Sequence, residues 1–395
     1  MKSKVEESIE KIDGWIERNG WNGYDPYDLK GTPFFIRIQQ FKPNASKVNE
    51  GIRRLIFGLA NKYPITMRRL FRVEEELNPK AMALFAHGYL KLHRTYDLDS
   101  YLQKAQECLE WLKEHPSQGH SGLCWGYPFD WQSRIFIPKG TPSAVVTSIA
   151  AHSFLDAYEE TGERTYLDIA ESACEFLTTD LNKDQIDEAR LCFSYTPIDH
   201  FHVHNANLFA ASLLSRVGNK LKNEKYTEDA RMAVNYTLGE QNLDGSWCYW
   251  GSTDQLPCYI DHYHTGFVLR CLYLIYKIGG GEELHAKIQK GFDYYTKNLF
   301  KDETIPKLTP KSTYPIDIHS CSEAILCLGT LDKEFPGASK ILRNTTEWIL
   351  QNMQDKKGYF YYRIYGNGHI DRTPYIRWSQ AWMLAALSTI SGRSE

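Results

Sequence analysis

Several features that are common in proteins are missing from this chain, and each absence narrows its function. The 395 residues contain no apolar run near the ~20 residues that span a bilayer, so no membrane span is expected. The formal net charge of -3 gives no broad basic surface for nucleic acid. GKT-type phosphate loops and GxGxxG turns are absent, so no nucleotide cofactor is indicated.

The beginning of the chain and its cysteines bear on localisation. The first residues, MKSKVEESIEKIDGW, are charged and amphipathic and lack the apolar core of a signal peptide. The nine cysteines are odd in number and scattered, which favours reduced thiols over a disulfide framework. We therefore expect a cytoplasmic protein.

Aromatic residues are abundant, with 25 Tyr, 18 Phe and 10 Trp, and many of them fall in turns. Aromatic side chains in turns are costly to leave in water, so we expect them to line a binding surface.

The strongest pattern is an internal repeat of two helices. One member of each pair is apolar nearly all round, which is typical of a helix buried on every side. These segments begin after positions 55 to 62 residues apart, a spacing typical of a two-helix repeat: Lys80, Pro142, His204, His264, His319 and Arg377. The other member is amphipathic, as in LDSYLQKAQECLEWLKEH.

The repeat predicts an all-α fold, an (α/α)6 toroid of six helical hairpins. The last hairpin lacks its amphipathic helix, and VEESIEKIDGWIERNG at the front is spare. We therefore expect the N-terminal helix to pair with the C-terminal helix and close the ring, in preference to an open stack. Residues 1–395 form one predicted domain, with an accessory helical insertion at about 29–73.

A family resemblance follows from these features. The Q-x-x-D-G-x-W turn at Gln241–Trp247 and the paired helices resemble the α/α toroids, which include six-hairpin glycosidases, terpenoid cyclases, toroidal polysaccharide lyases and lanthionine-forming cyclases. In those families the turn is structural. Stretches such as WGYPFDWQSR, IDHYHTGF and YPIDIHS also resemble proteins found beside polysaccharide-synthesis enzymes.

In such a ring the inner helices run parallel, so residues at their starts converge on one cavity. The predicted catalytic residues are Asp261, His264, His204, Asp317, His319, Asp130, Tyr195 and Tyr314. The predicted substrate-binding residues are Arg377, Asn205, Trp131, Gln132, Arg134, Trp247, Tyr249, Trp378, Gln380 and Lys80. An Asp at a helix start is first of all a cap. Imidazoles at the starts of three inner helices are harder to explain, because capping does not require them.

The electrostatics of this cavity predict an anionic ligand. Several helix N-termini add partial positive charge, and Lys80, Arg134 and Arg377 add full charges. The same field is expected to depress imidazole pKa values, so that the histidines act as neutral bases. Tyr and Trp at the mouth suit stacking on sugar rings.

Two mechanisms stay open at this point. In a uronate lyase or epimerase, Arg377 or Asn205 would bind the carboxylate, His204 or His264 would take the proton, and Tyr195 or Tyr314 would deliver one. In a glycoside hydrolase, two of Asp130, Asp261 and Asp317 would form the carboxylate pair.

Other functions fit less well. Terpenoid cyclisation needs an acidic DxDD-type cluster, and none is present. Trp247-Cys248-Tyr249 resembles part of the zinc motif of lanthionine-forming cyclases, but the Cys-His-Gly partner is absent and Cys321 with His319 replaces it only loosely. We predict no cofactor and no metal, with catalytic zinc as the weaker alternative.

The sequence thus predicts a carbohydrate-active enzyme that acts by acid/base catalysis on an acidic, uronate-containing glycan or glycan precursor in polysaccharide metabolism. The alternative is a non-catalytic glycan-binding or scaffold protein of a polysaccharide-assembly complex. The expected partners are an anionic glycan and other polysaccharide-synthesis proteins, and not nucleic acid.

Overall fold

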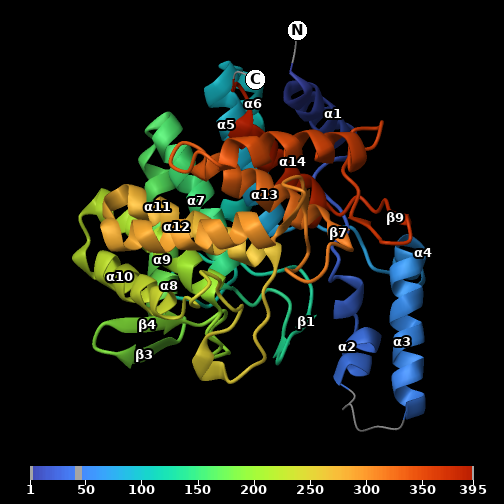
Figure 1. Cartoon of the computed structure of the whole chain (residues 1–395), viewed down its shortest axis with the longest axis horizontal. Coiled ribbons are helices and arrows are strands. Elements are labelled where there is room, and N and C mark those ends of the chain that lie inside the picture. The colour runs from blue at the N-terminus through green and yellow to red at the C-terminus, as the bar shows by residue number, and fades with distance from the viewer. Residues whose placement is uncertain (1–2, 41–46, 394–395) are drawn as a thin grey trace.

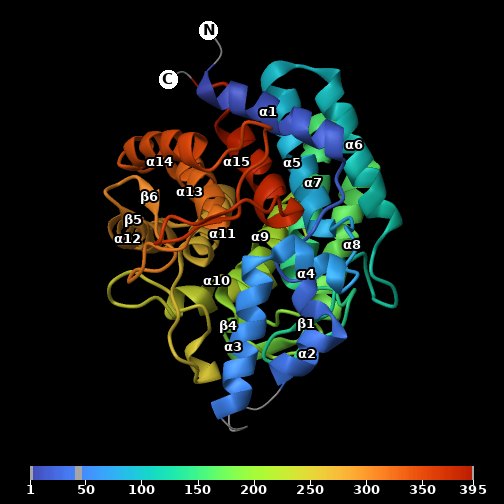
Figure 2. The same ribbon diagram turned by 90° about the vertical axis from the view of Figure 1, so that its right-hand side faces the viewer.

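Twelve helices of the described residues lie in two concentric rings (Figures 1 and 2). The computed structural model describes residues 3–40 and 47–393. The inner ring consists of α5 Pro79–Tyr96, α7 Ala144–Thr161, α9 His204–Leu221, α11 His262–Gly279, α13 Ile318–Leu331 and α15 Trp382–Ile390. The outer ring consists of α6 Asp99–Glu114, α8 Arg164–Thr179, α10 Glu224–Gly239, α12 Glu282–Asn298, α14 Ala338–Asn352 and α1 Lys4–Asn19. The fold is the predicted (α/α)6 toroid.

Contacts between neighbouring helices close the ring. Each inner helix packs against the next, and α15 packs against α5. Helix α15 is preceded by one π-helical segment, η3 Ile376–Ala381. Helix α1 packs against both α15 and α14. The prediction that the N-terminal helix pairs with the C-terminal helix is therefore confirmed.

The two helix types follow from where they lie. Helix α7 is buried at every position from Ala144 to Ala151, because it has neighbours on all sides. Helix α6 buries Ala105, Cys108, Leu109 and Leu112, which lie on one face at helical spacing. Apolar burial of the inner helices thus forms the core of the molecule.

The Q-x-x-D-G-x-W turn fastens one outer helix to the next. The Gln241 amide donates to the carbonyl of Gly245 and to that of Lys287 in α12, each at 3.0 Å. Gly245 has φ +95°, and a Cβ there would lie 2.3 Å from the Lys290 carbonyl oxygen, so this position requires glycine.

An equivalent turn fastens α1 in place. The Gln354 amide donates to the carbonyl of Gly358 at 2.9 Å and to that of Ser8 in α1 at 3.1 Å. Helix α1 therefore meets the turn after α14 as α12 meets the turn after α10. This contact supplies a local reason why the first helix completes the outer ring.

Short antiparallel strands occupy connections that run from an outer helix to an inner one. The pairs are β1 Trp131–Gln132 with β2 Phe136–Ile137, β3 Lys183–Asp187 with β4 Arg190–Phe193, and β5 Phe300–Lys301 with β6 Ile305–Pro306. A three-stranded sheet has the order β7 Ile316–Asp317, β8 Arg363–Ile364, β9 Ile370–Asp371, with Asp317 opposite Arg363. A short turn of helix, η2 Ser252–Asp254, lies in the connection before α11. These connections lie over the mouth where the inner helices begin.

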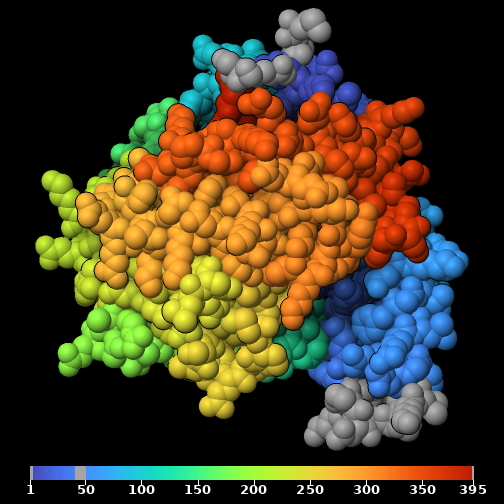
Figure 3. Space-filling model, in the orientation of Figure 1, coloured from blue at the N-terminus to red at the C-terminus, as the bar shows by residue number. Residues whose placement is uncertain are grey.

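The segment between α1 and α5 forms a helical lobe (Figure 3, blue at the lower right), which contacts β1. It contains η1 Leu29–Gly31, α2 Pro33–Gln40, α3 Lys47–Lys62 and α4 Pro64–Leu70. A small core of its own includes Leu29, Phe35 and Ala60, separate from the main core. These helices fall where an accessory insertion at about 29–73 was predicted, and the assignment of 1–395 as one domain stays a prediction.

The prediction of nine reduced cysteines is wrong for two of them. Cys248 and Cys258 form a disulfide that closes the connection between α10 and α11. The spacing of scattered cysteines could not indicate this pair, because the loop between them folds back on itself. The other seven cysteines are free and buried. Within residues 3–40 and 47–393, every helix is too short or too polar to cross a bilayer.

Candidate functional site

The mouth formed by the N-terminal ends of the inner helices has an aromatic wall. The ring of Tyr263 lies 4.3 Å from that of His264 and 4.7 Å from that of His319, measured between centroids. The His319 ring stacks on Trp378 at 4.3 Å. The starts of α11 and α13 and the π-helical segment before α15 therefore share one wall, as the repeat predicted.

The wall continues through a buried arginine. The Arg377 guanidinium lies 5.1 Å from the Trp378 ring and 4.9 Å from the Tyr127 ring. Its Nε and Nη2 donate to the two carboxylate oxygens of Asp25, at 2.5 and 2.8 Å. This bidentate pair fixes the guanidinium and joins the N-terminal connection to the ring.

Aromatic residues from three connections complete the wall. The Trp131 ring lies 6.3 Å from Tyr127 and 5.7 Å from Tyr195. Tyr27 contacts both Trp131, at 6.3 Å, and Trp378, at 5.7 Å. Each of these tyrosines is partly exposed, so they line a surface and do not fill the core.

His264 is the imidazole that the site orients most firmly. Its Nδ1 lies 2.7 Å from Oδ2 of Asp261, and its backbone N–H donates to Oδ1 of the same residue at 2.9 Å. Since a carboxylate only accepts, Nδ1 carries the hydrogen and Nε2 is left as the basic nitrogen. The Tyr249 ring packs against this imidazole at 4.3 Å. Asp261 thus caps α11 and sets the tautomer of His264.

His319 is buried in the same wall and is held neutral. Its backbone N–H donates to Asp317 at 2.8 Å, and its Nδ1 has no hydrogen-bond partner among the described residues. Burial lowers the pKa of His319 well below its usual range, and Lys80 and Arg377 lower it further. The predicted depression is therefore present, but burial and not the positive field is its main cause.

Lys80 lies beneath the wall, at the start of α5. Its ammonium is 5.2 Å from the Trp382 ring and 5.9 Å from the Phe267 ring, and no carboxylate of the described residues pairs with it. Burial lowers the pKa of Lys80 well below its usual value, and Arg377 adds to this. Lys80 was expected to add a full positive charge, and its burial, with 4% of the residue exposed, disfavours the charged form.

Asp317 was predicted as a catalytic carboxylate, but its oxygens are already engaged. Oδ2 accepts from Nε of Arg363 at 2.6 Å, and Oδ1 accepts from the Trp378 indole N–H at 2.8 Å. Oδ1 also caps α13. This fully buried carboxylate positions Trp378 and Arg363 and has no contact left for a substrate.

His204 does not reach the cavity, which corrects its predicted role. It is the first residue of α9 and stacks on Tyr236 of the outer helix α10 at 5.6 Å. Burial lowers its pKa to about 4. Relative to their N-caps, His204, His319 and His264 hold the first, second and third positions, so they point in different directions about the helix axis.

Three other predicted residues also have structural or exposed positions. Trp247 donates its indole N–H to the Thr237 carbonyl at 2.9 Å and packs against Gly291 of the outer ring. Gln380 exchanges two hydrogen bonds with the backbone of Phe360. Tyr314 is 44% exposed and packs near Gly366, and none of its ring contacts involves the wall. Trp247 and Gln380 are thus engaged with backbone groups, and Tyr314 lies at the surface.

The remaining predicted residues lie at the rim. Asp130 accepts from the backbone N–H of Lys139 at 2.7 Å, which holds the loop after β2. Gln132 bonds to Gln40 of the helical lobe at 2.9 Å. Arg134 is exposed and lies over Trp250 at 5.4 Å, whereas Asn205 is buried with its Oδ1 unpartnered.

A pocket of about 420 Å³ connects the rim to the wall. Its lining includes Tyr27, Lys30, Trp131 and Gln132. Burial, together with Arg363 and Arg68, lowers the pKa of Lys30 to about 8. The helical lobe thus supplies a cation that the sequence did not indicate.

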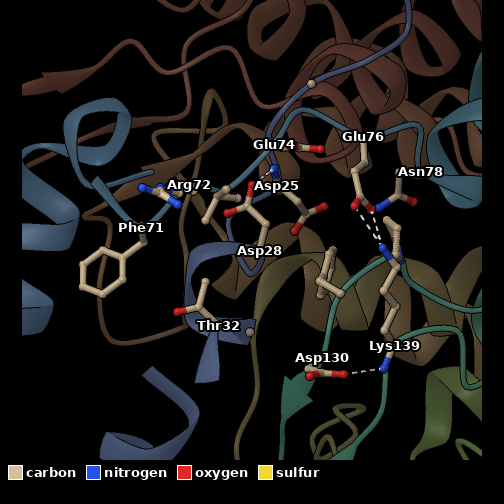
Figure 4. Close-up of a pocket in the computed structure, with 15 residues that line it drawn as sticks. Asp25, Asp28, Thr32, Phe71, Arg72, Glu74, Glu76, Asn78, Asp130 and Lys139 are labelled. Carbon is tan, nitrogen blue, oxygen red and sulfur yellow. Dashed lines mark hydrogen bonds and ion pairs between the residues drawn. The ribbon is translucent and has the colours of Figure 1, made fainter. Parts of the chain in front are cut away.

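A second pocket, of about 320 Å³, lies between the lobe and the ring (Figure 4). Asp25 and Asp28 line it, and they pair with Arg377 and Arg68 of other elements. On the opposite side Lys139 bonds to Glu76 at 2.9 Å (Figure 4). Because these charges are paired with one another, we regard this pocket as the joint that fixes the lobe.

Sequence reasoning missed several residues of the wall. These are Tyr27, Lys30, Tyr127, Tyr263, Phe267, Arg363 and Trp382. Tyr263 carried a usable signal, because it stands between His262 and His264 and helical geometry turns each side chain by about 100° from the last. Tyr27 and Lys30 carried none, since their position depends on how the lobe folds over the mouth.

The described residues show whether side chains gather in a way that could bind a metal ion. They contain no cluster of three or more His, Cys, Asp or Glu side chains that could hold an ion. Cys248 is held in the disulfide, and Cys321 is fully buried in α13.

Comparison with known proteins supports the fold. A family model described as D-glucuronyl C5-epimerase C-terminus matches residues 118–243. A comparison of the sequence with curated proteins found no match. Similar solved structures include a D-mannose isomerase, with 13% identity over 99% of this chain and 97% of that chain and a TM-score of 0.66.

Two further structures share the fold. One is the cellobiose 2-epimerase of Bacillus thermoamylovorans, with 12% identity over 79% of this chain and 87% of that chain and a TM-score of 0.63. The other is an unsaturated glucuronyl hydrolase specific for heparin, with 12% identity, coverage of 98% and 96%, and a TM-score of 0.63. At these identities the likeness establishes the toroid alone.

Proposed function

We propose that this protein is a carbohydrate-active enzyme that exchanges the C5 proton of a uronate residue in a glycan, as a uronyl epimerase. The observation that carries the proposal is the pair of Asp261 and His264, which orients an imidazole beside the rings of Tyr263 and Tyr249 at the start of α11. The partial match to the D-glucuronyl C5-epimerase family supports the same chemistry.

His264 is the proposed base. Its Nε2 takes the C5 proton, and the electrons of the C–H bond pass toward the carboxylate as an enediolate. Asp261 holds the Nδ1 hydrogen and stabilises the imidazolium that forms. His204, which was the other candidate base, faces the outer ring.

Cations near the mouth are suited to the charge that develops on the carboxylate. Arg377 is fixed by Asp25, and Arg363 is fixed by Asp317, so both present a preorganised guanidinium. Lys30 lies at the rim, where its lowered pKa of about 8 allows it to bind an anion as a cation at neutral pH. These groups favour a uronate over a neutral sugar.

Tyr195 is the proposed donor of a proton to the opposite face of C5. Burial raises the pKa of Tyr195 well above its usual value, so its hydroxyl stays protonated. The Tyr195 ring contacts Trp131, and Arg377 lies over Tyr127 in the same part of the wall. Tyr314, the other tyrosine predicted for this role, is exposed.

Hydrolysis is the second candidate, because the heparin-specific unsaturated glucuronyl hydrolase shares this fold. Inverting and retaining hydrolases both need two available carboxyl groups. Asp261 is engaged by His264, and Asp317 is engaged by Arg363 and Trp378. We therefore place proton exchange before hydrolysis.

Proton NMR in D2O tests the proposal. A glucuronate-containing oligosaccharide is incubated with the protein, and an oligosaccharide of neutral sugars is the control. We expect the C5 proton signal of the uronate to disappear while the glycosidic linkages stay intact. New reducing ends without exchange would establish hydrolysis, an unsaturated product would establish elimination, and binding without any reaction would establish a scaffold protein.

Localisation in the cytoplasm and association with polysaccharide-synthesis proteins stay predictions from the sequence. The disulfide between Cys248 and Cys258 counts against a reducing compartment. Thiol titration of the denatured protein, protected from oxidation and from reductants during purification, decides whether this disulfide is present. Seven reactive thiols support the disulfide, and nine support the cytoplasmic prediction.

A further inference from the structure

The ring has a second cavity on its axis besides the mouth of the candidate site. This axial cavity lies at the opposite end and is separate from the two pockets beside the helical lobe. Its volume is about 340 Å³. Every inner helix contributes to its lining, for example through Leu90, Ile149, Phe209, Leu274, Leu326 and Ala385. These residues come from the middle and the C-terminal parts of the helices that carry them, so the cavity opens where most inner helices end.

A single aromatic layer separates this cavity from the candidate site. Trp382 lines the cavity, and the same indole lies 5.0 Å from the His319 ring and 5.4 Å from the Phe267 ring. The two cavities therefore lie back to back along the axis. A ligand in the second one would touch a residue that supports the first.

Most charged groups around the second cavity are paired with one another. Arg216 donates to Asp156 at 2.9 Å, and His152 accepts from Arg216 through Nδ1 and bonds to Ser212 through Nε2. Arg94 pairs with Glu160, and Arg270 pairs with Glu323. These groups need no ligand, because each already has a partner.

Lys91 is the exception. It lines the cavity from α5, and among the described residues no carboxylate pairs with its ammonium and no side-chain hydrogen bond reaches it. Burial lowers its pKa, and Arg270, Arg94 and Arg393 lower it further, while only Asp156 opposes them among the main charges nearby. An ammonium that is partly withdrawn from water without a partner reduces the stability of the fold.

We propose that this axial cavity binds a small molecule carrying a carboxylate or a phosphate group, with its oxyanion on the ammonium of Lys91. The cavity has the size of a small-molecule site. The oxyanion supplies the partner that Lys91 lacks.

Titration calorimetry with the full chain tests this site, using inorganic phosphate, D-glucuronate and D-glucose as three separate probes. The variant is Lys91→Met, and the matched control is Lys113→Met, which removes an exposed lysine paired with Glu110 on α6. We expect at least tenfold weaker oxyanion binding in Lys91→Met and less than a twofold change in Lys113→Met. Binding of phosphate alone would identify a phosphate ligand, and binding of D-glucuronate alone would identify a carboxylate ligand.

Thermal unfolding separates a ligand-binding role from a structural one. Since Lys91 lacks a partner, Lys91→Met should raise the melting temperature of the unliganded protein by about 1–2 °C. Unchanged oxyanion binding in Lys91→Met, equal binding of D-glucose, or a lowered melting temperature would each overturn the proposal. If Lys91→Met does not fold, Lys91→Gln is used with the same criteria.

Discussion

His204 at the start of α9 and His264 in the first turn of α11 show that similar positions in the sequence can serve two purposes. His204 stacks on Tyr236 between the two rings and is 2% exposed. His264 lies on the inner side, bonded to Asp261, and its side chain is 22% exposed. Both stand at the start of an inner helix, but they differ by two positions relative to the N-cap. Two positions correspond to about 200° around the helix, which separates a packing residue from a candidate base.

The largest expected effect comes from removing the imidazole that faces the cavity. His264→Ala should reduce C5 proton exchange by about 1,000-fold, because a positioned general base contributes about 10² to 10⁴. The melting temperature should change little, since the side chain is partly exposed. The measurement is the exchange rate in D2O by NMR.

His204→Ala is the matched control for this prediction. It should leave the exchange rate within about threefold of the wild type and reduce the free energy of unfolding by about 2–3 kcal/mol, because it opens a hole beside Tyr236. Equal loss of exchange in the two variants would remove the distinction between the helix faces.

A smaller effect is expected for the residue that orients the base. Asp261→Asn keeps an oxygen to cap α11, but its amide presents N–H groups to Nδ1 and favours the wrong tautomer of His264. We expect kcat for exchange to fall by about 100-fold with KM nearly unchanged. A change confined to KM, or a loss of helix stability without a change in kcat, would mean that Asp261 acts only as a cap.

The smallest effect concerns the pH dependence of stability at His204. Its pKa is about 4 in the folded protein and 6.5 for an ordinary histidine, so the unfolded chain takes up the proton first as the pH falls. The stability that depends on the neutral ring is present above pH 6.5 and is lost as the pH falls toward 4.

Urea unfolding of His204→Phe checks this dependence. Between pH 7 and pH 5 the wild type should lose about 2 kcal/mol more than the variant. Other buried histidines, such as His152 and His262, contribute equally to both proteins and cancel in the difference. Parallel curves for the two proteins would show that His204 is protonated equally in both states.

The fold could be predicted because the same pair of helices recurs along the chain, so each repeat gives independent support for the toroid. The helix starts recur along the chain, and the spare segment at the front matches the missing partner of α15. The site could be predicted only in part. His264, His319, Arg377 and Trp378 were placed at the mouth from their positions near the starts of inner helices, whereas the partners of Asp317, Arg363 and Trp378, lie far along the chain and gave no local signal.

Other parts of the site carry no local signal at all. Tyr27 and Lys30 reach the mouth only because the lobe folds over it, and the pairing of Asp25 with Arg377 spans almost the whole chain. The rotation of each inner helix also depends on packing against two neighbours and an outer helix. A shift of one residue in the position of a helix start turns each side chain by about 100°, and the repeat spacing does not fix the start that finely.

In the proposed enzyme, residues from the starts of several inner helices share one cavity that binds a uronate. A crystal structure of His264→Ala with a glucuronate-containing oligosaccharide tests it most directly. We predict a uronate carboxylate within hydrogen-bond distance of Arg377, Arg363 or Lys30, with C5 facing the space left by the imidazole. An oligosaccharide bound elsewhere, or a neutral sugar at that position with the uronate outside the mouth, would contradict the account.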